Sequence, residues 1–150
     1  MSSTGKSHLA IALGMAACAA SQRVFYTTSE RMLSKLNASL ADGRLHTALT
    51  PYVRCGVLIL DDVGLEQAEL KNTARTRLMQ KVPFPKYENC LSTVITSNIP
   101  WEAWGAYLGD DLGAAGIMDR LIHRSHIIPI SGPSYRERQH SEETTAKVGK

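Results

Sequence analysis

Apolar and polar residues alternate along the chain in a pattern that predicts helices between short strands. Strong helix formers fill positions 7–22, while residues 23–28 are rich in β-branched and aromatic side chains. Residues 57–60 are continuously apolar and residues 91–96 contain a second apolar run, as expected of strands buried within a sheet. This order of strands and helices is typical of an α/β protein with a parallel sheet.

The spacing of apolar residues and the residue types typical of helix ends predict the positions of the other elements. The apolar face of the first helix consists of Leu9, Leu13, Ala16, Ala17 and Ala20. Thr27 and Glu30 match a capping box, which begins a helix with apolar residues at Met32, Leu33, Leu36 and Leu40. Further helices are expected over residues 45–52, 66–81, 101–107 and 111–124, with a break at the prolines of 82–85. Residues 127–130 predict a last strand, at a sheet edge or bulge because it contains a proline.

Composition narrows the class of protein. A hydrophobic content of 43% in 150 residues suits one globular domain, and a net charge of +3 is compatible with nucleic-acid binding without demanding it. Cys18, Cys55 and Cys90 form no C-x-x-C pair, so we expect a reduced, cytoplasmic protein with neither a disulfide framework nor a zinc site. The longest apolar stretch, residues 9–20, is too short to cross a bilayer, so no membrane association is expected.

The first candidate site lies where the first helix begins. Thr4-Gly5-Lys6-Ser7 matches the second half of the phosphate-binding pattern G-x-x-x-x-G-K-[ST]. Free backbone N–H groups and the helix dipole favour phosphate there, so ATP contacts are predicted for Ser3, Thr4, Gly5, Lys6, Ser7 and His8. In such a loop the lysine reaches the β- and γ-phosphates, and the Ser7 hydroxyl binds Mg²⁺. The alternative is a flexible terminus that happens to carry a lysine.

Polar side chains follow two of the predicted strands. Asp61 is placed to hold Mg²⁺, and Asp62 could orient or deprotonate an attacking water. Asn98 could contact a γ-phosphate oxygen or position that water. Each of these residues would also suit an ordinary polar turn. Arg120 could stabilise transition-state charge on a neighbouring subunit's phosphate, or it could be a surface arginine paired with an acid.

These motifs together resemble a known family. The segments "TGKSHLAIALG", "LILDDVG", "TVITSNIPWEAWG", "IMDRLIHRSHIIPI" and "GPSYRER" are similar to those of IstB-type transposition helper ATPases, relatives of DnaC-type helicase loaders in the AAA+ class. The resemblance implies an AAA+ P-loop domain over residues 1–136. Residues 137–150 lack large apolar side chains apart from Val148, which predicts a disordered tail. The resemblance also implies an ATP-hydrolysing homo-oligomer on DNA that assists a transposase or a replicative helicase, with Arg120 as an arginine finger in trans.

The sequence departs from the family pattern at three places. Asp62 stands where the family usually has glutamate, so slow hydrolysis is expected even if ATP binds. Pro83 and Pro85 interrupt a helix that the family normally continues. The first glycine of the loop and the strand before it are not in this sequence, which predicts a gap in the sheet centre and leaves open a truncated protein or a decayed, inactive fragment.

The contacts with DNA stay open at this stage. A basic group that could bind phosphates, or form an ordinary solvated face, consists of Arg44, Lys71, Arg75, Arg77 and Lys81. A nucleotide-independent DNA-binding or interaction module is the alternative from a different class. That alternative predicts binding unaffected by Mg-ATP or by the change Lys6→Ala.

Overall fold

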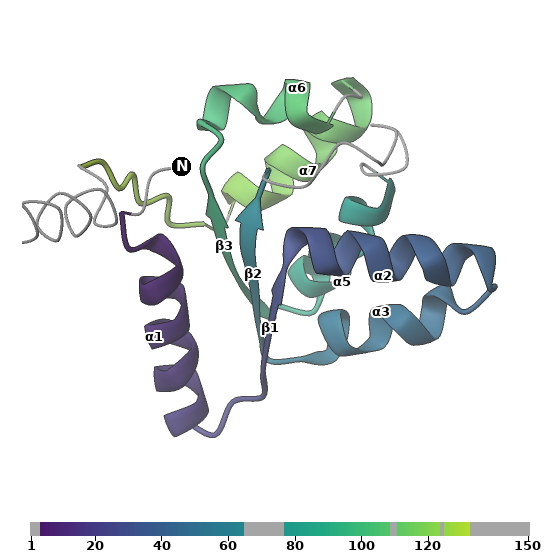
Figure 1. Ribbon diagram of the computed structural model, residues 1–150, viewed down its shortest axis with the longest axis horizontal. Helices are drawn as coiled ribbons and strands as arrows, with labels where there is room; N and C mark the ends of the chain where they lie inside the picture. The colour runs from purple at the N-terminus through teal and green to yellow at the C-terminus, as the bar shows by residue number, and fades with distance from the viewer. Residues whose placement is uncertain (1–3, 65–76, 109–110, 124, 133–150) are drawn as a thin grey trace, which may run out of the picture.

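The computed structural model describes residues 4–64, 77–108, 111–123 and 125–132. Residues 4–64 contain, in chain order, α1 (Lys6–Ala19), β1 (Val24–Thr28), α2 (Ser29–Ala41), α3 (Leu45–Arg54) and β2 (Val57–Val63). The rest of the described chain contains α5 (Pro83–Glu88), β3 (Ser92–Ser97), a 3₁₀ turn η1 (Trp101–Ala103), α6 (Trp104–Leu108) and α7 (Asp111–His123). Figure 1 shows α1 alone on one face of the sheet and α2, α3, α5 and α7 on the other.

The strands form a parallel sheet in the order β1-β2-β3, which confirms the predicted α/β class. β2 is central, and its residues Leu58, Ile59 and Leu60 are buried, as the continuous apolar run predicts. The three strands are hydrogen-bonded neighbours, so the expected gap in the sheet centre does not occur between them. Because parallel strands end at the same edge, the residues that follow β1, β2 and β3 meet there.

The face of α1 that packs against the sheet differs from the prediction. Leu9 and Leu13 are 45% and 48% exposed, whereas Ala10 and Gly14 are buried. A Cβ atom on Gly14 would lie 2.5 Å from Cδ1 of Ile59, so a larger residue there would require the Ile59 side chain to shift. The side chains of Ile59 and Val24 therefore pack against the small residues of α1, and its larger apolar residues lie outside.

The main core lies on the opposite face of the sheet. It joins Leu58, Leu60 and Val63 of β2 to buried residues of the helices, among them Met32, Leu33, Leu36, Tyr52, Trp104, Leu108 and Ile117. Trp101 and Trp104 pack together with ring centroids 5.7 Å apart. Buried Lys86 donates to the carbonyl oxygen of Cys55 at 2.8 Å and joins α5 to the end of α3. Burial lowers the pKa of this lysine.

Three boundaries also differ from the sequence prediction. The N-cap of α2 is Thr28, whose Oγ1 accepts from the Arg31 N–H, because Thr27 is buried within β1. The prolines do end the preceding helix, since residues 77–80 are helical and 81–82 form a turn. However, Pro83 begins α5, where a proline's missing N–H is harmless. Residues 127–130 form no strand, and Ile127 and Ile128 are exposed.

Candidate functional site

The described residues before α1 are Thr4 and Gly5 of the predicted phosphate-binding loop. Gly5 is the N-cap of α1 with φ 86°, a left-handed conformation that glycine adopts readily. Gly5 has no side chain, so the N-cap residue itself makes no capping hydrogen bond to the N–H groups of the first turn. Lys6 is half-buried and its Nζ donates to Thr4 Oγ1 at 3.0 Å, while His8 is exposed. Predicted Ser3 lies outside the described residues.

Asp61 at the end of β2 joins this loop to the sheet. Its Oδ1 accepts hydrogen bonds from Ser7 Oγ, at 3.0 Å, and from Thr96 Oγ1 of β3. Its Oδ2 accepts from the Tyr26 hydroxyl of β1 at 2.6 Å. The carboxylate is buried, and hydroxyl groups from three separate elements converge on it. Ser7 and Asp61, each predicted to hold Mg²⁺, are therefore brought together in the structure.

The direction of these hydrogen bonds fixes the charge of Asp61. Thr96 Oγ1 accepts the backbone N–H of Asp62 at 3.0 Å, so its single proton is left for the Asp61 carboxylate. Burial alone would raise the pKa of Asp61, but hydrogen bonds from Thr96, Tyr26 and Ser7 outweigh burial and lower it. The hydrogen bond to Asp61, followed by burial, raises the pKa of Tyr26 to about 12. Asp61 is therefore an ionised acceptor at neutral pH.

A β-bulge sets the positions of the two aspartates. Leu60 pairs with Ile95 while Val63 pairs with Ser97, so Asp61 and Asp62 together lie opposite Thr96. Asp62 has φ 58°, a left-handed conformation that aspartate tolerates better than most residues. Bulges redirect side chains near functional sites. Here the bulge leaves the Asp61 side chain buried and that of Asp62 half-buried.

The turns after β2 and β3 are tied to each other. Ser97 Oγ donates to the carbonyl oxygen of Val63 at 2.9 Å and accepts from the Ile99 N–H at 3.0 Å. Gly64 has φ 92°, and a Cβ atom there would overlap the Ile99 side chain. These contacts hold Asn98 just past the end of β3, where it is exposed. The two acids and Asn98 thus lie at the ends of β2 and β3, and the Ser7–Asp61 hydrogen bond brings the start of α1 to the same edge of the sheet.

Comparison with known proteins agrees with this arrangement. The profile of the family described as "IstB-like ATP binding protein" matches residues 1–143. The chain belongs to this family. It is 36% identical over 132 residues to the "Insertion sequence IS21 putative ATP-binding protein" of Pseudomonas aeruginosa, covering 88% of this chain and 48% of that protein. It is 38% identical over 138 residues to the "Putative insertion sequence ATP-binding protein y4pL" of Sinorhizobium fredii, covering 92% and 55%.

The IstB-like chain thus spans about half the length of these relatives. Among solved structures it is similar to the DnaC helicase loader, with a TM-score of 0.68 and 22% identity over 85% of this chain and 73% of that chain. It is also similar to AMPPCP-bound DnaA from Aquifex aeolicus, with a TM-score of 0.69 and 15% identity over 99% and 54%. At these identities the likeness concerns the fold, which is the AAA+ type of P-loop fold.

The IstB-like site has a donor set that suits Mg²⁺. The Ser7 proton points to Asp61, which leaves the lone pairs of the hydroxyl oxygen available to a cation. Within the described residues, no group of three or more His, Cys, Asp or Glu side chains could hold a metal ion. Proteins usually bind Mg²⁺ through one or two carboxylates together with substrate phosphates, and Asp61 offers one carboxylate beside the Ser7 hydroxyl.

Arg120 is on α7, a different element from the loop and the strands that hold the other predicted site residues. It is half-buried, and its Nη1 donates to the carbonyl oxygen of Gly116 at 3.2 Å, along its own helix. Of the basic group, Arg44, Arg77 and Lys81 are exposed, whereas Lys71 and Arg75 lie outside the described residues. No described helix of the IstB-like chain has the length and apolar character of a membrane span.

Sequence reasoning did not assign roles to Tyr26 and Thr96. Both touch Asp61 from neighbouring strands, and their closeness depends on register, because Thr28 rather than Tyr26 is the residue paired with Asp61. The available signal is strand alternation, which places Tyr26 and Thr28 on the same face of β1. A long side chain with a terminal donor on that face can reach the end of the next strand.

Proposed function

We propose that this chain binds ATP with Mg²⁺ and, as a homo-oligomer on DNA, assists the transposase of an insertion sequence. The observation that carries the nucleotide part is the hydrogen bond from Ser7 to Asp61, which joins the glycine turn before α1 to the end of β2. A chance G-K-S sequence at a terminus would have no reason to face a buried carboxylate 54 residues away. Family membership supports the same nucleotide.

Each residue then has a distinct role. Thr4, Gly5 and His8 form the loop around the phosphates together with Lys6, whose ammonium would leave Thr4 for a phosphate oxygen. Ser7 and Asp61 would hold Mg²⁺, which neutralises phosphate charge when bound. Asp62 would orient or deprotonate the attacking water, and Asn98 would contact the γ-phosphate. In the oligomer, Arg120 would act on the neighbouring subunit's nucleotide.

The relatives favour a transposase as the partner. The matching proteins of Pseudomonas aeruginosa and Sinorhizobium fredii are described as insertion-sequence ATP-binding proteins. A helicase-loading role rests on the likeness to DnaC, which concerns the fold. For DNA, we propose that exposed Arg44, Arg77 and Lys81 contact backbone phosphates.

A binding titration tests the nucleotide part. A fluorescent ATP analogue with Mg²⁺ is titrated into the wild-type chain, the Lys6→Ala variant and a matched Lys35→Ala variant, in which an exposed lysine of α2 is lost instead. We expect saturable binding that weakens at least about tenfold in Lys6→Ala, because a charge-assisted phosphate contact is lost, and stays unchanged in Lys35→Ala. Equal affinity of all three folded proteins would exclude the loop as an ATP site.

The same variants separate ATP-dependent from ATP-independent DNA binding. If DNA affinity responds to Mg-ATP in wild type and not in Lys6→Ala, the nucleotide and DNA functions are coupled. If DNA affinity is the same with and without Mg-ATP in every variant, the chain acts as a nucleotide-independent binding module.

A further inference from the structure

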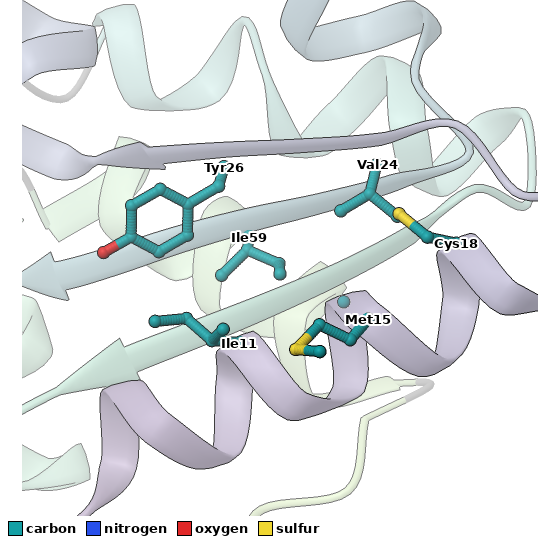
Figure 2. A pocket seen from close by; sticks show the side chains of 7 residues that line it. Ile11, Met15, Cys18, Val24, Tyr26 and Ile59 are labelled. Atoms are coloured by element: carbon teal, nitrogen blue, oxygen red, sulfur yellow. The ribbon is translucent and has the colours of Figure 1, made fainter.

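Tyr26 connects an apolar pocket to the buried carboxylate. The aromatic ring lines an open pocket of about 550 Å³ between α1 and the sheet, shared with Ile11, Gly14, Met15, Cys18, Val24 and Ile59. Figure 2 shows the Tyr26 hydroxyl pointing away from Cys18 and Val24, along the strands and toward their arrowheads. There it donates to Asp61 Oδ2 at 2.6 Å. The ring is therefore placed by apolar contacts and its hydroxyl by the carboxylate.

The two carboxylate oxygens of Asp61 are held from different elements. Ser7 of α1 and Thr96 of β3 bind Oδ1, whereas Tyr26 of β1 binds Oδ2. The Tyr26 hydroxyl is the side-chain donor described at Oδ2, so its loss would remove the side-chain contact that orients this oxygen. Partners behind a metal ligand typically change metal affinity about 10–100-fold when removed, because they orient that ligand.

We propose that Tyr26 is a positioning residue that orients Asp61 for divalent-cation binding beside Ser7, an inference that rests on the function proposed for this site. Both the length of the side chain and its hydroxyl donor favour tyrosine at this position. Tyr26 pairs with Ile59, two residues before Asp61, so its side chain must extend along the strand to touch the carboxylate. Phenylalanine would fill the same pocket and provide no donor.

The test compares two tyrosine-to-phenylalanine changes. Tyr26→Phe removes the hydroxyl at the carboxylate, and the matched control Tyr52→Phe removes one on the other side of the sheet, where the ring packs edge-on against Phe25. For each protein, we measure the Mg²⁺ concentration that gives half of the Mg²⁺-promoted binding of the fluorescent ATP analogue. Affinity for the analogue in EDTA is measured separately.

We expect Tyr26→Phe to raise the required Mg²⁺ concentration about tenfold and to leave the affinity in EDTA unchanged. Tyr52→Phe should change neither. A merely structural role would weaken binding in both conditions equally, and that result would overturn the proposal. An unchanged Mg²⁺ requirement would overturn it too, while leaving the ATP-binding function intact.

A separate measurement covers failure of the proposed function itself. If the wild-type chain binds no nucleotide, Mn²⁺ is titrated into the protein alone and followed by electron paramagnetic resonance. Weaker Mn²⁺ binding by Tyr26→Phe than by wild type and Tyr52→Phe would still support the positioning role. Equal binding by all three proteins, or none by any, would overturn it.

Discussion

At the scale of single residues, the backbone conformation at position 62 favours aspartate, whereas the reach needed by the proposed general base favours a longer side chain. The left-handed backbone of Asp62 within the bulge suits aspartate, which adopts that conformation more readily than glutamate does. The family that the sequence resembles usually has glutamate there, whose carboxylate reaches one methylene further. The shorter residue therefore fits the backbone of this chain well and shortens the reach toward an attacking water.

The change Asp62→Glu should raise ATP turnover, because the longer side chain brings a general base closer to the water. The free energy of unfolding of this variant should fall by less than about 1 kcal/mol relative to wild type, since glutamate is less suited to the left-handed region. Steady-state hydrolysis and denaturant unfolding measure the two effects. Asp62→Asn is the control, expected to keep stability and lose turnover. A lower or unchanged rate in Asp62→Glu would remove Asp62 from the role of base.

At the residue level, motifs in the sequence single out Ser7, in the loop pattern, and Asp61, at the end of an apolar strand, each as a candidate Mg²⁺ ligand. The structure places these two side chains within hydrogen-bonding distance. Tyr26 and Thr96 were not singled out, since their approach to Asp61 depends on the register of three strands and on a bulge. Neither the register nor the bulge can be derived from the linear order of apolar residues.

At the scale of elements, α1 is held against the sheet by a narrow contact. Its buried residues are Ala10 and Gly14, and Ser7 at its first turn bonds to Asp61. The distance between α1 and β2 therefore sets the distance between the loop and Asp61, the proposed metal ligand. Side-chain size at one helical position controls the geometry of the site.

The change Gly14→Val should destabilise the protein by about 1–3 kcal/mol, because the added side chain collides with Ile59. It should also weaken nucleotide binding, since displacement of α1 separates Ser7 from Asp61. Chemical denaturation and the analogue titration measure both effects. Leu13→Val, at a position 48% exposed on the same helix, is the control and should change neither. Equal stability of the two variants would contradict the close packing described above.

Element-level prediction worked for local patterns and failed for packing partners. The continuous apolar run of residues 57–60 correctly indicated the central strand β2, since burial on both faces leaves that pattern. The second run indicated β3 as a strand, but β3 is an outer strand of the described sheet and most of its residues are half-buried rather than buried. The buried face of α1 was assigned by hydrophobicity, whereas the sheet selects it by size. Residues 127–130 have a strand-like composition, but Pro129 lacks a backbone donor and no strand beside them is described.

At the scale of the whole molecule, the two faces of the sheet are unequally covered. The larger core includes residues of α2, α3, α6 and α7, while on the other face α1 is the one described helix that covers the sheet in Figure 1. Leu9, Ile11, Leu13 and Met15 of α1 are exposed. Stability therefore depends mainly on one side of the sheet, whereas the loop and Tyr26 lie on the other.

The pH dependence of unfolding should reveal the Tyr26–Asp61 hydrogen bond in the intact molecule. The pKa of Tyr26 is about 12 in the folded protein against an ordinary value of 10.0, so its contribution to stability is complete below pH 10.0 and is lost as pH rises toward 12. The difference in free energy of unfolding between wild type and Tyr26→Phe should shrink over that interval. A difference that stays constant with pH would contradict the assigned hydrogen bond.

Comparing wild type with Tyr26→Phe isolates the contribution of Tyr26 to the pH dependence of unfolding. Burial also raises the pKa of Tyr52, which acts in the same direction as Tyr26, and it lowers the pKa of Lys86, which acts in the opposite direction. Tyr52 and Lys86 are present in both proteins, so their contributions cancel in the difference. Denaturant titrations at a series of alkaline pH values provide the measurement.

The convergence on Asp61 has a practical consequence for the choice of an inactive reference protein. Replacing this acid by asparagine would remove a metal ligand and also leave three hydroxyl groups, on α1, β1 and β3, without their charged acceptor. A loss of function would then be inseparable from a loss of structure. The Lys6 ammonium bonds to Thr4 within its own loop, so Lys6→Ala is the cleaner knock-out for genetic and biochemical work.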